Sequence, residues 1–309
     1  MRARSRHDPI LARLGPKSGL REPGSRPLLS GAAVIDLHTH STVSDGSDRP
    51  EAIPELAHAA GCRAVALTDH DRLDGIEAAA GRARSLGVEF VPGCELSCEH
   101  TGTMHMLVYF LEPGEGPLQN ELGRLQDARD NRNQRMAALM ERLGLPVTYD
   151  EIIAEAGGEG AGRPHIARIL VRKGVVGSIQ EAFDVWLAKG RPAYLDKERL
   201  SPDAAVGLAR ASGAVPVLAH PLSLGLSGPD LESTVAELAG YGLGGVEAIY
   251  GRYSPEDRAG LAELAARHRL VATGGSDHHG TFKPDLRVGV GTGDLDVPDT
   301  ALEELKARR

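Results

Sequence analysis

The chain has 309 residues, of which 35 are Lys or Arg and 43 are Asp or Glu, so its formal net charge is −8. The hydrophobic and charged fractions, 41% and 25%, are those of an ordinary globular protein and exclude a largely disordered chain. No apolar run approaches the roughly 18 residues of a membrane-spanning helix, so no membrane association is expected. The chain has only three cysteines, which excludes a disulfide scaffold and predicts a cytoplasmic protein. The negative net charge argues against duplex DNA as a partner.

Residues 1–32 differ in composition from the rest of the chain. Seven Lys and Arg residues stand against two acidic ones, a local charge of +5, and four prolines interrupt any helix. This composition predicts a disordered basic tail; a nucleic-acid-binding arm is the alternative, supported by charge alone. No apolar stretch precedes a small-residue cleavage site, so a secretory signal peptide is not expected.

From residue 33 onward, short apolar runs alternate with amphipathic helical patterns. Regular alternation of strands and helices along the chain predicts an α/β fold with a mainly parallel sheet. Seven strands come close to the eight of a closed (β/α) barrel, so we expect a distorted barrel. The predicted strands cover residues 33–37, 64–68, 89–92, 104–111, 215–219, 246–249 and 270–274, and the helices between them cover 51–60, 75–86, 231–241 and 255–268.

The middle of the chain, residues 112–192, lacks this alternation. Residues 118–143 form one long helical pattern with few β-branched side chains, ended by Gly144 and Pro146. We interpret the segment as a helical domain inserted between two parts of the barrel, residues 33–111 and 193–309. Its three shorter helices are predicted at residues 149–156, 164–173 and 178–188.

Histidines and carboxylates gather where the predicted strands end. His38 with His40, and Asp277 with His279, are spaced i and i+2, which places both side chains of a pair on one face of a strand. The C-terminal ends of barrel strands converge on the face where active sites are built. Residues from different strands can therefore meet there. The remaining candidates at or beside strand ends are Asp45, His70, Glu95, His105 and His220.

These residue types indicate metal ions in a hydrolytic role. Imidazole and carboxylate without thiolate suit Mn, Zn or Fe. Six histidines and three carboxylates exceed the ligand number of one ion, so two to three clustered divalent ions are expected. Such a cluster stabilises the attacking and leaving oxygens in a displacement at phosphorus, and it supplies a metal hydroxide as the nucleophile. No serine or cysteine nucleophile is then needed.

In order and spacing the motifs resemble the PHP (polymerase and histidinol phosphatase) superfamily from about residue 34 to the end of the chain. They are Asp36-x-His38-x-His40, Thr68-Asp69-His70, Gly93-x-Glu95, His105, Ala219-His220-Pro221 and Gly275-Ser276-Asp277-x-His279. The resemblance implies a distorted (β/α)7 barrel with a trinuclear metal site. It implies that one ion is held by His38, His40, Glu95 and Asp277, a second by Glu95, His105 and His220, and a third by Asp45, His70 and His279.

The inserted segment carries a group of basic residues, followed by a helix start. Arg129, Arg132 and Arg135 occupy positions i, i+3 and i+6, a spacing that predicts three guanidiniums along one stripe of a helix. Pro164 suits the first position of the next helix, whose free N–H groups and positive dipole end would lie beside Arg163 and His165. We interpret these residues as a site for a second phosphate; a solvated basic face is the alternative. The candidates are Arg129, Arg132, Asn133, Arg135, Arg163 and His165.

This segment is similar to that of bacterial PHP phosphoesterases acting on nucleoside 3′,5′-bisphosphates, relatives of which trim RNA from its 5′ end. The resemblance implies a metal-dependent phosphoric ester hydrolase of the phosphatase or exonuclease type. Its expected substrate is a phosphorylated nucleotide, which would lose its 3′-phosphate, or a short 5′-phosphorylated RNA, which would lose 5′-terminal nucleotides. The alternatives are a histidinol-phosphate phosphatase, with the same barrel and ligands, and a nucleotide-binding module with a decayed catalytic site.

Some roles beyond the metal ligands are also predicted. His220 and His165 are the candidates for the general acid that protonates the leaving group. Asp36 and Asp69 are interpreted as partners that orient ligating imidazoles. Glu247 ends a predicted strand and faces the site by topology, with no role assigned.

Overall fold

The computed structural model describes residues 34–156 and 161–309. The predicted basic tail, residues 1–32, lies outside the described residues. As expected, the fold is built on a seven-stranded sheet, whose strands are neighbours in chain order. The strands are β1 (Val34–Asp36), β2 (Cys62–Leu67), β3 (Glu89–Cys98), β4 (Met104–Tyr109), β5 (Val215–Leu218), β6 (Gly245–Tyr250) and β7 (Val271–Gly275).

One strand reverses the direction of the sheet. β4 is antiparallel to both of its neighbours, β3 and β5, whereas all other pairs are parallel. The reversal places the N-terminal end of β4 beside the C-terminal ends of the other strands. β3 is also longer than predicted, because residues Gly93–Cys98 pair with β4.

Backbone hydrogen bonds between the first and last strands bring the two edges of the sheet together. The Leu37 N–H donates to Gly274 O at 3.2 Å, and the Asp277 N–H donates to His38 O at 2.8 Å. This approach needs a glycine at position 275, because a Cβ there would lie 2.5 Å from the His38 nitrogen. The sheet is therefore a distorted (β/α)7 barrel, as predicted.

Helices cover the barrel and close one of its ends. α1 (Ala52–Ala59) and α2 (Ile76–Leu86) follow the first two strands, and α8 (Gly228–Tyr241) and α9 (Pro255–Arg267) follow β5 and β6. After β7, α10 (Asp299–Lys306) packs Leu302 and Leu305 onto an apolar cluster that includes Ile35, Leu107 and Val217 of the strands. No helix within the described residues combines the length and apolarity needed to span a membrane.

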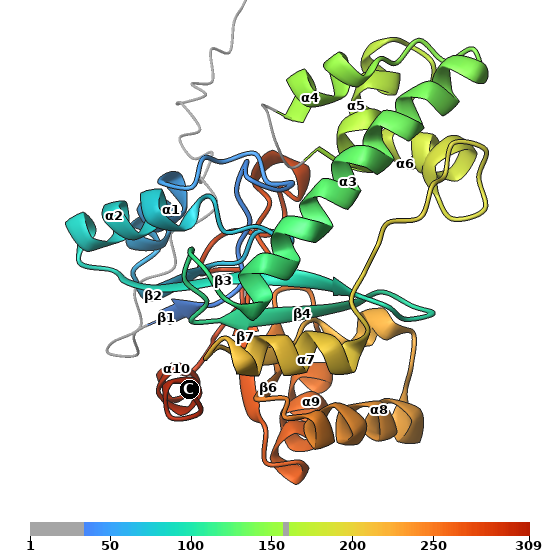
Figure 1. The fold of residues 1–309 in the computed structure, drawn as a ribbon. Helices are drawn as coiled ribbons and strands as arrows, with labels where there is room; N and C mark the ends of the chain where they lie inside the picture. The colour runs from blue at the N-terminus through green and yellow to red at the C-terminus, as the bar shows by residue number, and fades with distance from the viewer. Residues whose placement is uncertain (1–33, 157–160) are drawn as a thin grey trace, which may run out of the picture. The chain divides into compact units, whose positions relative to one another are not determined.

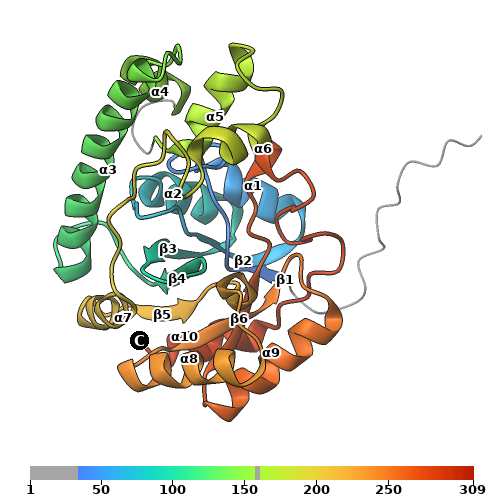
Figure 2. The ribbon, with the colours of Figure 1, turned by 90° about the vertical axis from the view of Figure 1, so that its right-hand side faces the viewer.

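The helical insertion has an apolar cluster of its own. α3 (Pro117–Arg142) buries Leu118 and Leu122 against the barrel, whereas Met136 and Met140 pack among the shorter helices. Figures 1 and 2 show α3 running from the sheet to this group. The boundaries at residues 112 and 192 stay predictions. The shorter helices are α4 (Tyr149–Ala156), α5 (Arg163–Arg172) and α6 (Ile179–Ala182), which continues as a π-helical turn (Phe183–Leu187).

The sequence analysis did not predict two of the helices, α7 (Pro202–Ala211) and α10. The buried side chains of α7 are Ala205, Val206 and Ala209, so its buried positions carry no large apolar residue. α10 follows the last predicted strand, after which no further helix was expected.

Candidate metal centre and adjoining cavity

All nine predicted ligand side chains meet at one end of the barrel. They follow β1, β2, β5 and β7, with Glu95 inside β3 and His105 near the start of β4. His105 belongs to this end because β4 is antiparallel to its neighbours. We call these nine residues the metal-site cluster: His38, His40, Asp45, His70, Glu95, His105, His220, Asp277 and His279.

Glu95 lies at the centre of the cluster. Burial alone would raise its pKa, but the imidazoles of His70 and His105 hold the pKa of this carboxyl well below its ordinary range. Glu95 is therefore ionised, and five imidazoles lie within ion-pair distance of its carboxylate. Its Oε2 lies 3.3 Å from His38 Nε2, 3.1 Å from His40 Nε2 and 3.2 Å from His70 Nδ1, and its Oε1 lies 2.9 Å from both His105 Nδ1 and His220 Nε2.

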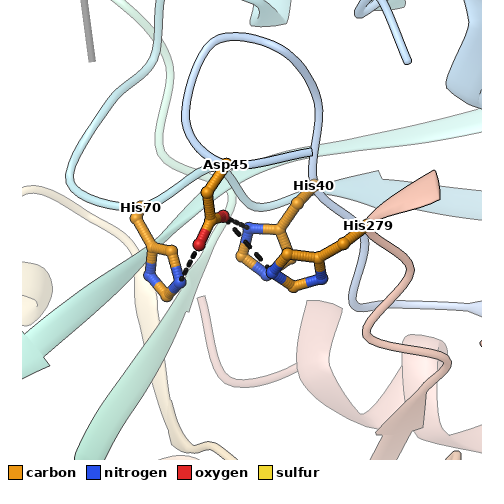
Figure 3. A group of neighbouring side chains, drawn as sticks. All are labelled: His40, Asp45, His70 and His279. Atoms are coloured by element: carbon orange, nitrogen blue, oxygen red, sulfur yellow. Dashed lines mark ion pairs between the residues drawn. The ribbon is translucent and has the colours of Figure 1, made fainter. Parts of the chain in front are cut away.

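Asp45 forms a second group with three histidines. Figure 3 shows its carboxylate between His70 on one side and His40 and His279 on the other. Asp45 Oδ1 lies 3.2 Å from His279 Nε2 and 3.8 Å from His40 Nδ1, and Oδ2 lies 3.8 Å from His70 Nε2. Histidine and carboxylate atoms of all four residues lie within 4.8 Å of one another.

Asp277 forms a third group with His38 and His40. Its Oδ1 lies 3.5 Å and 3.3 Å from their Nε2 atoms. Its Oδ2 accepts hydrogen bonds from Tyr250 Oη at 2.8 Å and Lys283 Nζ at 2.7 Å. The sequence analysis missed these last two residues, because a single tyrosine and a single lysine form no pattern.

The chemistry of the cluster fits divalent metal ions. Its donors are imidazole nitrogens and carboxylate oxygens, the set that suits Mn, Zn and Fe. The buried Nδ1 atoms of His40 and His70 make no hydrogen bond within the described chain, which leaves their lone pairs for a ligand. The groups overlap more than the resemblance implied, since His70 also lies with Glu95 and His105. The assignment of residues to individual ions therefore stays a prediction.

Glu247 links two members of the cluster from different strands. It is fully buried on β6, with Oε1 2.9 Å from His38 Nδ1 and Oε2 accepting the His220 N–H at 2.7 Å. His220 and Asp277 hold positive φ angles of 24° and 56°. Such angles are uncommon outside glycine and are typical of functional sites held by their surroundings.

Among the described residues, no imidazole forms a hydrogen bond or an ion pair with Asp36 or Asp69, so the prediction that they orient ligating imidazoles is wrong. Asp36 accepts the backbone N–H groups of His38, Ser276 and Gly289. Asp69 accepts hydrogen bonds from Ser41 N, Ser41 Oγ and Ser44 Oγ. Both carboxylates therefore shape the backbone that carries the ligands and do not orient the rings.

A cavity of about 530 Å³ connects the cluster to the helical insertion. Asp45, His70 and His105 line one part of it. Six cations of α3, α5 and the segment before α7 line another part. Two of them are Lys189 and Arg199, and we call the other four the cation pocket: Arg129, Arg132, Arg163 and Lys197.

The cation pocket carries more positive than negative charge. Asp71 forms ion pairs with Arg129 and with Lys197, whose Nζ lies 3.4 Å away. Arg132 and Arg163 form no ion pair with a carboxylate of the described residues, although Arg132 is only 6% exposed. Burial and the neighbouring Arg129 and Arg163 lower the pKa of Arg132 to about 10. Burial also lowers the pKa of Lys197 to about 8, against the attraction of Asp71.

Comparison with known proteins assigns the family. A family model of the PHP domain matches residues 36–192, half of the chain. The chain belongs to the PHP domain family. It is 32% identical over 259 residues to a 3′,5′-nucleoside bisphosphate phosphatase of Chromobacterium violaceum, covering 83% of this chain and 91% of that protein.

Two further PHP relatives cover most of the chain. A 5′-3′ exoribonuclease of Haemophilus influenzae is 32% identical over 245 residues, covering 79% of this chain and 89% of that protein. The crystal structure of a putative metal-dependent phosphoesterase from Bifidobacterium adolescentis superposes with a TM-score of 0.78 at 29% identity, over 90% of this chain and 97% of that one.

The structure of the present chain corrects two details of the predicted arginine stripe. Arg135 is exposed and does not line the cavity, because six helical positions turn a side chain 120° away from Arg129. Asn133 is buried and does not line the cavity either. Its Nδ2 donates to Ala161 O at 2.9 Å and its Oδ1 accepts from Arg132 Nη2 at 2.8 Å, so it positions Arg132.

His165 lines the cavity at the start of α5. Its Nδ1 accepts the Gly162 N–H at 3.1 Å, so the proton of the neutral ring resides on Nε2. Burial and the nearby Arg168 lower the pKa of His165 to about 4. The imidazole is thus neutral at pH 7 and offers a hydrogen-bond donor.

Proposed function

We propose that this PHP protein removes the 3′-phosphate from nucleoside 3′,5′-bisphosphates, or 5′-terminal nucleotides from short 5′-phosphorylated RNA. The enzyme class, a metal-dependent phosphoric ester hydrolase, follows from the family and from the relatives that match most of the chain. One observation carries the proposal: the metal-site cluster and the cation pocket line the same cavity. One cavity can thus take the reacting phosphate at one site and a second phosphate at the other.

The nine residues of the metal-site cluster are proposed to hold two to three divalent ions, Mn, Zn or Fe. When bound, the ions supply positive charge to the phosphoryl oxygens and lower the pKa of the attacking water. Glu95, ionised among five imidazoles, would bridge ions. Of the two roles predicted for His220, its Nε2 contact with Glu95 supports the role of ligand.

The cation pocket is proposed to bind the remote 5′-phosphate. Charges shielded from water without a partner are costly. Arg132 is buried and Arg163 is half-buried, and neither has a carboxylate partner among the described residues. A dianionic phosphate would offset this cost, with His165 Nε2–H as a further neutral donor. The ammonium group of histidinol phosphate would instead meet a pocket of like charge, which disfavours that alternative substrate.

The experiment compares kcat/KM of the metal-loaded enzyme for adenosine 3′,5′-bisphosphate, adenosine 3′-monophosphate, histidinol phosphate and a 5′-phosphorylated oligoribonucleotide. A bisphosphate should be preferred over the monophosphate by at least about tenfold, the value of charge-assisted hydrogen bonds to one phosphate. Arg132→Met and Arg163→Met should each remove most of this preference. Arg142→Met, an exposed position of the same α3 helix, is the matched control and should retain it. Equal turnover of the bisphosphate and the monophosphate by the wild type would refute the proposal.

A further inference from the structure

Tyr194 is the only Phe, Tyr or Trp among the described residues that line the cavity. It lies in the irregular segment that leads from the helical insertion to α7, and its side chain is half-buried. Neither the sequence motifs nor the proposed function above gives this residue a role.

The Tyr194 ring is held in place from two directions. Its Oη donates to Asp196 Oδ1 at 2.7 Å, and Arg199 Nη1 donates to the same oxygen at 2.7 Å. The guanidinium carbon of Arg163 lies 5.3 Å from the centre of the ring, a cation–π contact. A ring fixed in this way loses little conformational entropy when a ligand packs on it.

Arg163 relates the ring to the proposed phosphate site, because it belongs to the cation pocket and also contacts Tyr194. A nucleotide with its 3′-phosphate at the metal-site cluster and its 5′-phosphate at the cation pocket must place its ribose between them. The base on that ribose then reaches a wall of the same cavity. Bases of any sequence stack on aromatic side chains.

We propose that Tyr194 forms a nucleobase subsite, on which the purine or pyrimidine of the substrate stacks while Arg163 holds its remote phosphate. This inference rests on the proposed function, since it assumes the same two phosphate positions. It adds that the enzyme selects nucleosides over phosphorylated sugars that lack a base.

The test compares two substrates that differ only in the base. The first is adenosine 3′,5′-bisphosphate and the second is 1,4-anhydroribitol 3,5-bisphosphate, which keeps both phosphates and the 2-hydroxyl and has no base. For the wild-type holoenzyme, kcat/KM should favour the adenosine compound by about tenfold, within the range measured for single base–aromatic stacks. Tyr194→Leu should remove most of this factor, whereas Tyr194→Phe and Tyr194→Trp should retain it because they keep the ring.

Phe183→Leu is the matched control. Phe183 contacts the Arg163 guanidinium at 5.9 Å but does not line the cavity, so its replacement should lower kcat/KM for both compounds by the same factor. If Tyr194→Leu also affects both compounds equally, Tyr194 only positions Arg163 and the inference is wrong. Equal kcat/KM of the wild-type enzyme for the two compounds would overturn the inference as well.

Failure of the inference is distinguishable from failure of the proposed function. The proposed function fails if the second phosphate gives no advantage over adenosine 3′-monophosphate. The base subsite fails if that advantage is present and the base gives none. Should Tyr194→Leu not fold, the comparison of Tyr194→Phe and Tyr194→Trp with the wild type still decides, because loss of base preference in either folded variant contradicts stacking on the ring.

Discussion

Glu247 Oε1 lies 2.9 Å from His38 Nδ1, in a fully buried pair that joins β6 to the end of β1. This contact fixes a proton on His38 Nδ1 and leaves Nε2 as the electron-pair donor toward the metal-site cluster. The second carboxylate oxygen of Glu247 accepts the backbone N–H of His220, so the same side chain also holds a second ligand candidate.

Glu247→Gln should weaken binding of Mn or Zn by about tenfold to a hundredfold, the usual cost of losing an outer partner of a metal ligand. The amide can no longer accept from both His38 and His220, because one of its two terminal atoms is a donor. Titration calorimetry of the metal-free protein measures the effect. Glu263→Gln, an exposed position on α9, serves as the control. Equal affinities in Glu247→Gln and wild type would contradict the positioning role.

We expect Lys197 to give the enzyme a pH-dependent preference for a second phosphate. Burial lowers its pKa to about 8, so its ammonium is present below that pH and is lost as the pH rises through it. The ratio of kcat/KM for the bisphosphate to that for the 3′-monophosphate should therefore fall above about pH 8. Ionisations at the metal-site cluster affect kcat/KM for both substrates equally, so they leave this ratio unchanged.

Two variants of Lys197 check the origin of this dependence. Lys197→Arg should move the fall to higher pH, because a guanidinium keeps its proton. Lys197→Met should give a lower ratio without this fall. The same fall near pH 8 in Lys197→Met would show that another group is responsible.

Gly275→Ala should destabilise the protein by about 1–3 kcal/mol, the cost of overpacking. A Cβ at this position would lie 2.5 Å from the His38 nitrogen, where the last strand approaches the first. Gly81→Ala is the control, since this glycine of α2 has open space around it and alanine favours a helix by about 1 kcal/mol. Urea unfolding should show a lower midpoint for the first variant and an unchanged or higher one for the second.

The convergence of the nine cluster residues could be predicted because it follows from local rules. Spacing of i and i+2 places His38 with His40, and strand ends of a barrel share one face. The direction of β4 could not be predicted from its apolar pattern, which is the same for parallel and antiparallel strands. His105 was therefore found as a candidate, but its place at the start of a reversed strand was not.

Contacts of single polar residues had no signal in the sequence. Lys197 and Tyr194 lie in an irregular segment without periodicity, and only the folded chain brings them to the cavity. Asp36 accepts backbone N–H groups from residues that are distant in sequence, which no side-chain motif records. Arg135 was misplaced because a three-residue repeat drifts around a helix of 3.6 residues per turn.

The central claim is that one cavity holds the 5′-phosphate in the cation pocket while the 3′-phosphate is hydrolysed at the metal-site cluster. The most direct test is to incubate the metal-loaded enzyme with adenosine 3′,5′-bisphosphate and identify the nucleoside monophosphate formed by chromatography and phosphorus NMR. The account predicts adenosine 5′-monophosphate with release of inorganic phosphate. Adenosine 3′-monophosphate as the main product would contradict it.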